Sequence, residues 1–124
     1  WNFYPGLPEP FRREFDQVYR EHAPELAARL RRWEEQTRQR EASMNDSGLF
    51  FPVVLHHYEW SARYDTRQYL GLLTTYSDHL ALPESRRRKL LDGIAAVLGR
   101  HGGAIEKPYH TVLFLAKKPA APSA

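Results

Sequence analysis

The chain has 124 residues, 18 of them basic and 15 acidic, and it contains no cysteine. This length suffices for one domain with a hydrophobic core. A net charge of +3 is too small to indicate nucleic-acid binding. Without cysteine there is neither a disulfide framework nor a thiolate metal site, and no apolar run approaches a membrane span. We therefore expect a cytoplasmic protein that has no nucleic-acid or membrane partner.

The sequence pattern of the first part of the chain predicts two helical segments followed by a loop. Pro10 suits a first helical position, because its missing N–H needs no partner there. The apolar positions that follow share one helical face: Phe11, Phe15, Val18, Tyr19 and His22. Pro24 breaks or kinks this helix, and a second stretch has Leu26, Leu30 and Trp33 on one side. Composition then predicts a loop from Ala42 to Gly48.

A strand and a helix are predicted next. Phe50–Trp60 has the pattern of a strand, and Pro52 together with a polar second half favours an edge position. Asp65 and Gln68 have the spacing of a capping box, which predicts the start of a helix. The apolar face of that helix is Tyr69, Leu72, Leu73 and Tyr76.

The chain closes with a helix and a strand. Pro83 opens the helix, and Gly102-Gly103 ends it before a final strand, Ile105 to Lys117. The buried stripe of the helix is Leu90, Leu91, Ile94, Val97 and Leu98. Val112–Ala116 is an unbroken apolar run, typical of a strand buried on both faces.

The closing strand should therefore lie inside a sheet, with Phe50–Trp60 on its outer side. Its other side needs a neighbour, and we expect none within this chain. The small-residue segment 118–124 is expected to be a disordered tail.

Aromatic residues gather in the middle of the chain. The cluster consists of Tyr58, Trp60, Tyr64, Tyr69 and Tyr76, and Ser77 follows it directly. Aromatic walls with a few polar groups are typical of a pocket for an organic substrate. The alternative is ordinary core packing between a strand and a helix.

Histidines and a basic run are weaker signals. His56-His57 could supply one metal ligand, but no histidine pair has the helical i, i+4 spacing. We therefore expect no metal site, and histidines that are solvated or hydrogen-bonded. Arg86–Lys89 lies in the first turn of a helix, where positive charge is mildly unfavourable. It either binds a phosphate or acidic surface, or serves as a solubilising face.

Several blocks of the second half form one larger pattern. They are Trp60-Ser61 through Tyr64, Tyr69 through Leu80 with its Tyr76-Ser77-Asp78-His79 core, Leu90 to Gly103, and Pro108 to Ala116. Tyr58 to Lys117 thereby resembles the C-terminal part of class I S-adenosylmethionine-dependent methyltransferases. The nearest branch is the one termed methyltransferase type 11 or trans-aconitate-methyltransferase-like. Trp1-Asn2 is similar to the residues that follow the fifth strand in these enzymes.

The resemblance implies an α/β fold, namely the C-terminal part of a Rossmann-like methyltransferase sheet. In that fold the last strand inserts antiparallel between the fifth and sixth strands. Ile105–Lys117 would be the inserted strand and Phe50–Trp60 the sixth, with about four helices and with the first five strands absent. Residues 1–117 would form the acceptor-side part of the domain. The glycine-rich cofactor loop would lie upstream, so we expect no cofactor-binding residue in this chain.

The implied reaction moves a methyl group from S-adenosylmethionine to a small organic acceptor, by in-line attack on the sulfonium methyl. Trp1, Asn2 and Tyr4 would sit at the carboxyl end of the fifth strand, where open α/β sheets bind ligands. The expected substrate-binding residues are Trp1, Asn2, Tyr4, Tyr58, Trp60, Tyr64, Tyr69, Tyr76 and Ser77. His57 and His79 are the candidates for a catalytic base, where the acceptor needs one.

Two accounts of the chain stay open. It begins at Trp1 and not at Met, which favours a truncated or processed chain that is inactive alone. Its partner would be the missing N-terminal half, a separate chain that carries that half, or a second copy held through an exposed sheet edge. The alternative is a self-contained α+β binding module that uses the aromatic pocket or the basic run 86–89.

Overall fold

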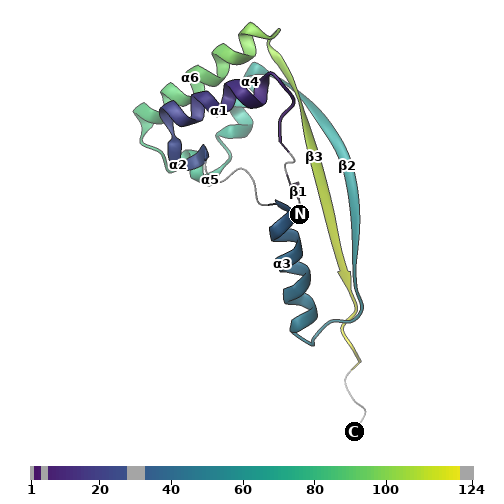
Figure 1. Cartoon of the computed structure of the whole chain (residues 1–124). Helices are drawn as coiled ribbons and strands as arrows, with labels where there is room; N and C mark the ends of the chain where they lie inside the picture. Colours follow the sequence, from purple (N-terminus) through teal and green to yellow (C-terminus); the bar gives the residue numbers. More distant parts are fainter. Residues whose placement is uncertain (1, 4–5, 28–32, 121–124) are drawn as a thin grey trace. The chain divides into compact units, whose positions relative to one another are not determined.

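The computed structural model describes residues 2–3, 6–27 and 33–120, which form a mixed α/β fold (Figure 1). The first half holds β1 (Asn2–Phe3), α1 (Phe11–His22), α2 (Pro24–Ala27) and α3 (Trp33–Asp46). The second half holds β2 (Val53–Asp65), α4 (Thr66–Leu73), α5 (Ser77–Leu80), α6 (Glu84–Arg100) and β3 (Ala104–Ala116). In this described part of the chain, no helix combines the length and apolarity needed to cross a membrane.

The chain forms two compact units, and the two long strands contribute to both. Unit 1 comprises Trp1–Pro5, Arg32–Trp60 and Tyr109–Ala124, with β1, α3, the first part of β2 and the second part of β3. Unit 2 comprises Gly6–Arg31 and Ser61–Pro108, with the other helices and the remaining strand segments.

The described strands form one sheet in the order β1-β3-β2. The Phe51 N–H bonds the Lys117 carbonyl and the Thr66 N–H bonds that of Gly103, so β2 and β3 run antiparallel. The predicted interior position of the closing strand and edge position of the preceding one are confirmed.

The closing strand also has a neighbour on its other side, so the prediction that this chain supplies none was wrong. β1 pairs antiparallel with β3, with Asn2 opposite Thr111 and Phe3 opposite His110. A two-residue strand is too short to show an alternating pattern, which is why the sequence did not reveal it.

The apolar run of β3 is buried on one face only, contrary to its predicted burial on both. Val112 is fully buried, whereas Leu113 and Leu115 are 42% and 48% exposed. Alternate residues of a strand point to opposite faces, so these two leucines share the exposed side.

The core of unit 2 lies between α1, α4, α6 and the start of β3. Its fully or nearly fully buried apolar side chains include Phe15, Leu73, Leu90, Ile94, Val97, Leu98 and Ile105. The stripes predicted for α1, α4 and α6 are thus confirmed, with several members only partly buried, among them Phe11, Val18, Leu72 and Leu91. Of the stripe predicted after Pro24, Leu26 is buried, whereas Leu30 and the Trp33 side chain lie outside the described part of the structure. Burial of such a stripe, more than intrinsic propensity, is what stabilises helices of this length.

Gly93 lets α6 approach α1 closely, and its replacement by alanine is expected to destabilise unit 2. A Cβ at this position would lie 2.6 Å from Val18 Cγ1. The clash should cost about 1–3 kcal/mol, more than the ~1 kcal/mol that alanine gains in helix propensity. Urea unfolding followed by circular dichroism would measure the difference.

Gly99 provides the matched control in the same helix. A Cβ there meets nothing within 4 Å, so Gly99→Ala should stabilise by roughly 0.5–1 kcal/mol. Adding Val18→Ala to Gly93→Ala should recover part of the loss. Equal effects at the two glycines would contradict the close approach.

Capping residues, prolines and glycines in the sequence predicted most of the helix boundaries correctly. α4 begins as predicted, because the Gln68 N–H donates to Asp65 Oδ1 at 2.7 Å and the Asp65 N–H to Gln68 Oε1 at 3.0 Å. The strand before it was predicted to end at Trp60 but continues to this cap. Pro83 precedes α6, and Gly102-Gly103 ends it with φ of 91° and 75°.

The loop predicted from Ala42 to Gly48 was wrong, since α3 continues to Asp46. Gly48, with φ of 67°, is the residue that ends the helix. The Ser47 hydroxyl donates to the Met44 carbonyl at 2.8 Å and satisfies one acceptor of the last turn. Residues 117–120 carry no helix or strand, and the rest of the predicted tail lies outside the described residues.

Candidate functional site

The predicted substrate residues fall into both units. Trp1 and Tyr4 lie outside the described residues. Unit 1 holds Asn2, Tyr58 and Trp60, together with His57. Unit 2 holds Tyr64, Tyr69, Tyr76 and Ser77, together with His79.

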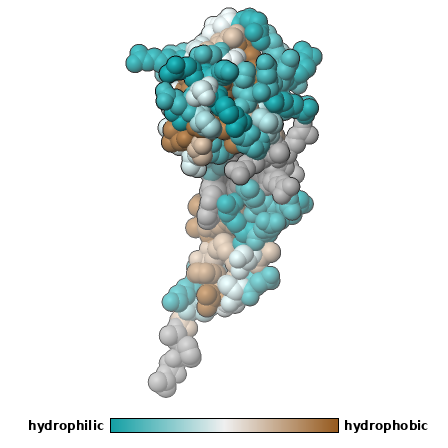
Figure 2. Space-filling model, turned by 90° about the vertical axis from the view of Figure 1, so that its left-hand side faces the viewer, coloured by the Kyte–Doolittle hydropathy of each residue, from teal (hydrophilic) through white to brown (hydrophobic). Residues whose placement is uncertain are grey.

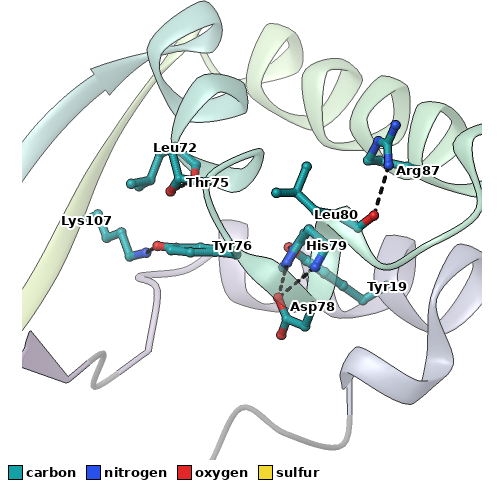
Figure 3. A network of polar contacts seen from close by, with 9 residues as sticks. All are labelled: Tyr19, Leu72, Thr75, Tyr76, Asp78, His79, Leu80, Arg87 and Lys107. Atoms are coloured by element: carbon teal, nitrogen blue, oxygen red, sulfur yellow. Dashed lines mark hydrogen bonds and ion pairs between the residues drawn. The ribbon is translucent and has the colours of Figure 1, made fainter.

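A buried polar network surrounds His79 in unit 2 (Figure 3). Its Nε2 is 2.7 Å from the hydroxyl of Tyr19, which reaches it from α1. Its Nδ1 is 2.7 Å from Asp78 Oδ1, and that oxygen also accepts the backbone N–H of His79 at 2.8 Å. Tyr19 and His79 are buried, whereas the Asp78 side chain is about one-third exposed. The network thus links the solvent-facing Asp78 to the core.

The protonation states in this network follow from burial. Burial, and after it the nearby charge of Asp78, raises the pKa of Tyr19 far above its usual value. The phenol therefore keeps its proton, and its hydroxyl donates a hydrogen bond to His79 Nε2 in the tautomer whose Nδ1–H donates to Asp78. Both ring nitrogens are engaged, so His79 could accept a substrate proton only after Tyr19 moved away. The role of His79 as a base stays a prediction, and its hydrogen bonds to Tyr19 and Asp78 give it a structural role in unit 2.

Lys107 was not singled out from the sequence, yet it is buried beside this network. Its side chain is on β3, the residue is 6% exposed, and Nζ lies 3.0 Å from the Tyr76 hydroxyl. The rings of Tyr69 and Tyr76 have their centroids 6.0 and 5.4 Å from Nζ. Burial lowers the pKa of Lys107 to about 8. Strand alternation was the available signal, because it places Lys107 with Ile105 and Tyr109.

The tyrosines of unit 2 pack as core residues. Tyr69 is buried, and its ring centroid lies 5.7 Å from that of Phe15 and 6.1 Å from that of Tyr64. Tyr64 and Tyr76 are partly buried against the same core. The core-packing alternative therefore accounts for Tyr69. Tyr76 differs, because its hydroxyl contacts Lys107 and its ring lies 5.5 Å from that of His79.

In unit 1 the structure brings Asn2 and Trp60 together through one side chain. Trp60 Nε1 donates to Thr111 Oγ1 at 2.8 Å, and that hydroxyl donates to Asn2 Oδ1 at 2.6 Å. The Trp60 ring stacks on Tyr109 with centroids 4.3 Å apart and an interplanar angle of 11°. The arrangement fixes the indole against the sheet.

His57 makes a cross-strand contact. Its Nδ1 lies 2.8 Å from His110 Nε2, and His110 Nδ1 lies 3.8 Å from Glu59 Oε1. Over the described residues, no three or more His, Asp or Glu side chains are placed to hold a metal ion. As predicted for the histidines, this pair is hydrogen-bonded.

Arginines of the basic run 86–89 bind other groups of this chain. The sequence had predicted either a binding surface for a phosphate or acidic partner or a solubilising face, and neither prediction included such intramolecular contacts. Arg86 donates to the His22 carbonyl and binds both oxygens of Glu25, at 2.7 and 2.8 Å. Hydrogen bonding by Arg86 lowers the pKa of Glu25. Arg87 donates to the carbonyls of Leu80 and Leu82 at 3.2 and 3.3 Å. These two arginines therefore connect α6 to α2 and to the end of α5. Two of the four basic side chains are thus already engaged, and fewer are available to bind a phosphate.

Neither the models of known protein families nor the curated proteins contain a match to this chain.

Proposed function

We propose that this chain is the closing, acceptor-side portion of a class I S-adenosylmethionine-dependent methyltransferase. The observation that supports this best is the position of β3, which lies between β1 and β2 and is antiparallel to both. The resemblance of Tyr58–Lys117 implies such an inserted strand. Under the proposal the finer fold is Rossmann-like, β2 is its sixth strand and β3 its last.

The register of β1 adds support. Asn2 opposite Thr111 and Phe3 opposite His110 mean that a strand arriving from upstream would run along Leu113 to Ala116. This is the side on which the proposal places the fifth strand. The cofactor loop and the residue that holds the ribose would lie further upstream, in the missing N-terminal half or in a separate chain.

The proposed reaction requires no residue of this chain to form a covalent bond with the substrate. When bound by the upstream part, S-adenosylmethionine would supply a methyl group on a sulfonium; an acceptor oxygen, nitrogen or carbon would take this methyl while the methyl–sulfur electron pair stays on sulfur, and an acceptor that carries a proton would release it to water or to a base. Positioning and exclusion of water supply most of the acceleration. In this proposal each unit has its own candidate contacts for the acceptor: Asn2 and Trp60 in unit 1, and Tyr76 with Lys107 in unit 2.

Calorimetry with S-adenosylmethionine tests the proposal in two arms. The 124-residue chain alone should give no measurable heat of binding, because it has no glycine-rich loop after a strand. The product of the reading frame extended upstream should bind the cofactor. Binding by the 124-residue chain, or an upstream sequence without such a loop, would sink the proposal.

A further inference from the structure

One face of the β2–β3 ribbon in unit 1 is exposed and uncharged. Trp60 stacks on Tyr109 and bonds Thr111, so even positions of β2 share this face with odd positions of β3. The ribbon face, as we define it, consists of Val54, His56, Tyr58, Trp60, Tyr109, Thr111, Leu113 and Leu115. None of these is Lys, Arg, Asp or Glu, although such residues make up 27% of the chain.

Five apolar side chains of the ribbon face are open to solvent, whereas Tyr109, on which Trp60 stacks, is only 6% exposed. Tyr58 is 52% and Trp60 45% exposed, and Val54, Leu113 and Leu115 are exposed to a similar degree. Figure 2 shows hydrophobic side chains reaching the surface of unit 1, whereas the helices of unit 2 present mostly hydrophilic ones. A contiguous apolar patch of this kind on a protein surface marks an interaction site.

We propose that the ribbon face is the contact between two copies of this chain, related by a two-fold axis. Such an axis places the same patch of both copies in contact, with residue i of one copy against residue j of the other and the reverse, so the patch must itself supply an opposite charge for each Lys, Arg, Asp or Glu that it carries. The ribbon face has none, and two copies can therefore approach without burying an unpaired charge. Two sheet faces of this type pack about 10 Å apart with interdigitated side chains.

The size of the patch fits a reversible dimer. The exposed portions of its five apolar side chains amount to roughly 500 Å² per copy, or about 1,000 Å² for the pair, which is the lower bound of specific interfaces. The dimer should thus form and dissociate with concentration. It differs from pairing through a sheet edge, because side chains are buried and no new strand ladder forms. The inference does not rest on the proposed function.

Analytical ultracentrifugation over about a hundred-fold range of concentration tests the inference. The chain should pass from monomer to dimer, and Tyr58→Lys with Leu115→Lys should weaken the dimer at least about tenfold, since the lysines would be buried on a face that offers them no opposite charge. Leu80→Lys is the matched control, because Leu80 is also 52% exposed but lies on α5 in unit 2. It should leave the dimer unchanged.

A second variant keeps the test decisive if the lysines disturb folding, as judged by circular dichroism. Tyr58→Thr with Leu115→Thr removes apolar area while keeping good strand formers, and it should also weaken the dimer. A chain that is monomeric throughout, or a dimer that neither variant weakens, would overturn the proposal. So would a longer gene product that stays monomeric where the 124-residue chain dimerises, since another segment would then cover the ribbon face.

Discussion

Replacing Lys107 by methionine is expected to raise the free energy of unfolding by about 1–3 kcal/mol at pH 7. The pKa of Lys107 falls from its reference of 10.5 to about 8 in the folded protein, because burial disfavours the ammonium. One pKa unit corresponds to ~1.4 kcal/mol, which sets an upper limit of about 3 kcal/mol on the burial cost. Methionine fills a similar volume without a charge, although the contact with Tyr76 is lost.

The pH dependence identifies the cause. Below about pH 8 the amine is protonated in both states, so the folded protein carries the full cost of a buried ammonium. Between about pH 8 and 10.5 only the unfolded chain binds the proton, and stability contributed by this group rises with pH. The stabilising effect of Lys107→Met should therefore be largest at pH 7 and should shrink toward pH 10.

Urea unfolding followed by circular dichroism at pH 7 and at pH 10 would measure both effects. Lys89→Met is the matched control, since Lys89 is exposed on α6 in the same unit. It should change stability by no more than about 0.5 kcal/mol at either pH. A destabilised Lys107→Met variant at pH 7, or one whose effect does not change with pH, would show that the ammonium is not penalised by burial.

The fold was predictable wherever a local signal decides the structure. The capping box at Asp65, the prolines before α1 and α6, and the glycines after α6 each act within a few residues, and they set the element boundaries. The two-residue β1 and the exposed side of Val112–Ala116 were missed. Strand pairing and solvent exposure depend on residues far away in the chain, and no local pattern reports them.

In the candidate site too, local sequence patterns indicated some residues, whereas features that depend on distant residues could not be predicted. Aromatic density indicated Tyr69 and Tyr76, but it could not show that the Tyr69 ring is buried in the core or that the Tyr76 hydroxyl contacts Lys107. Lys107 looked like an ordinary polar residue of a strand, because its burial comes from α4 and the segment after it. Likewise, the partners of Arg86 on α2 are more than sixty positions away, so a run of four bases looked like a free surface.

Removing the Tyr19 hydroxyl and the His79 side chain together is expected to cost less than the sum of the two single changes. Tyr19→Phe leaves His79 Nε2 buried without its donor, at a cost of about 1–3 kcal/mol. His79→Ala also opens a cavity and leaves the buried phenol unpaired, so about 2–5 kcal/mol is expected. With both changes, the two desolvation penalties vanish together. The double variant should thus be more stable than the sum of the single effects predicts, by roughly 0.5–3 kcal/mol.

Amide hydrogen exchange of α6 is the appropriate measurement, because all three tryptophans lie outside unit 2 and fluorescence would not report it. The slowest amides should be those of the buried turn that contains Ile94, Val97 and Leu98. His56→Ala is the matched control, since His56 is exposed on β2 in unit 1, and it should leave these amides unchanged. Strict additivity of Tyr19→Phe and His79→Ala would mean that the two side chains do not act as a pair. His79 would then be free to take part in chemistry that its bond to Tyr19 now prevents.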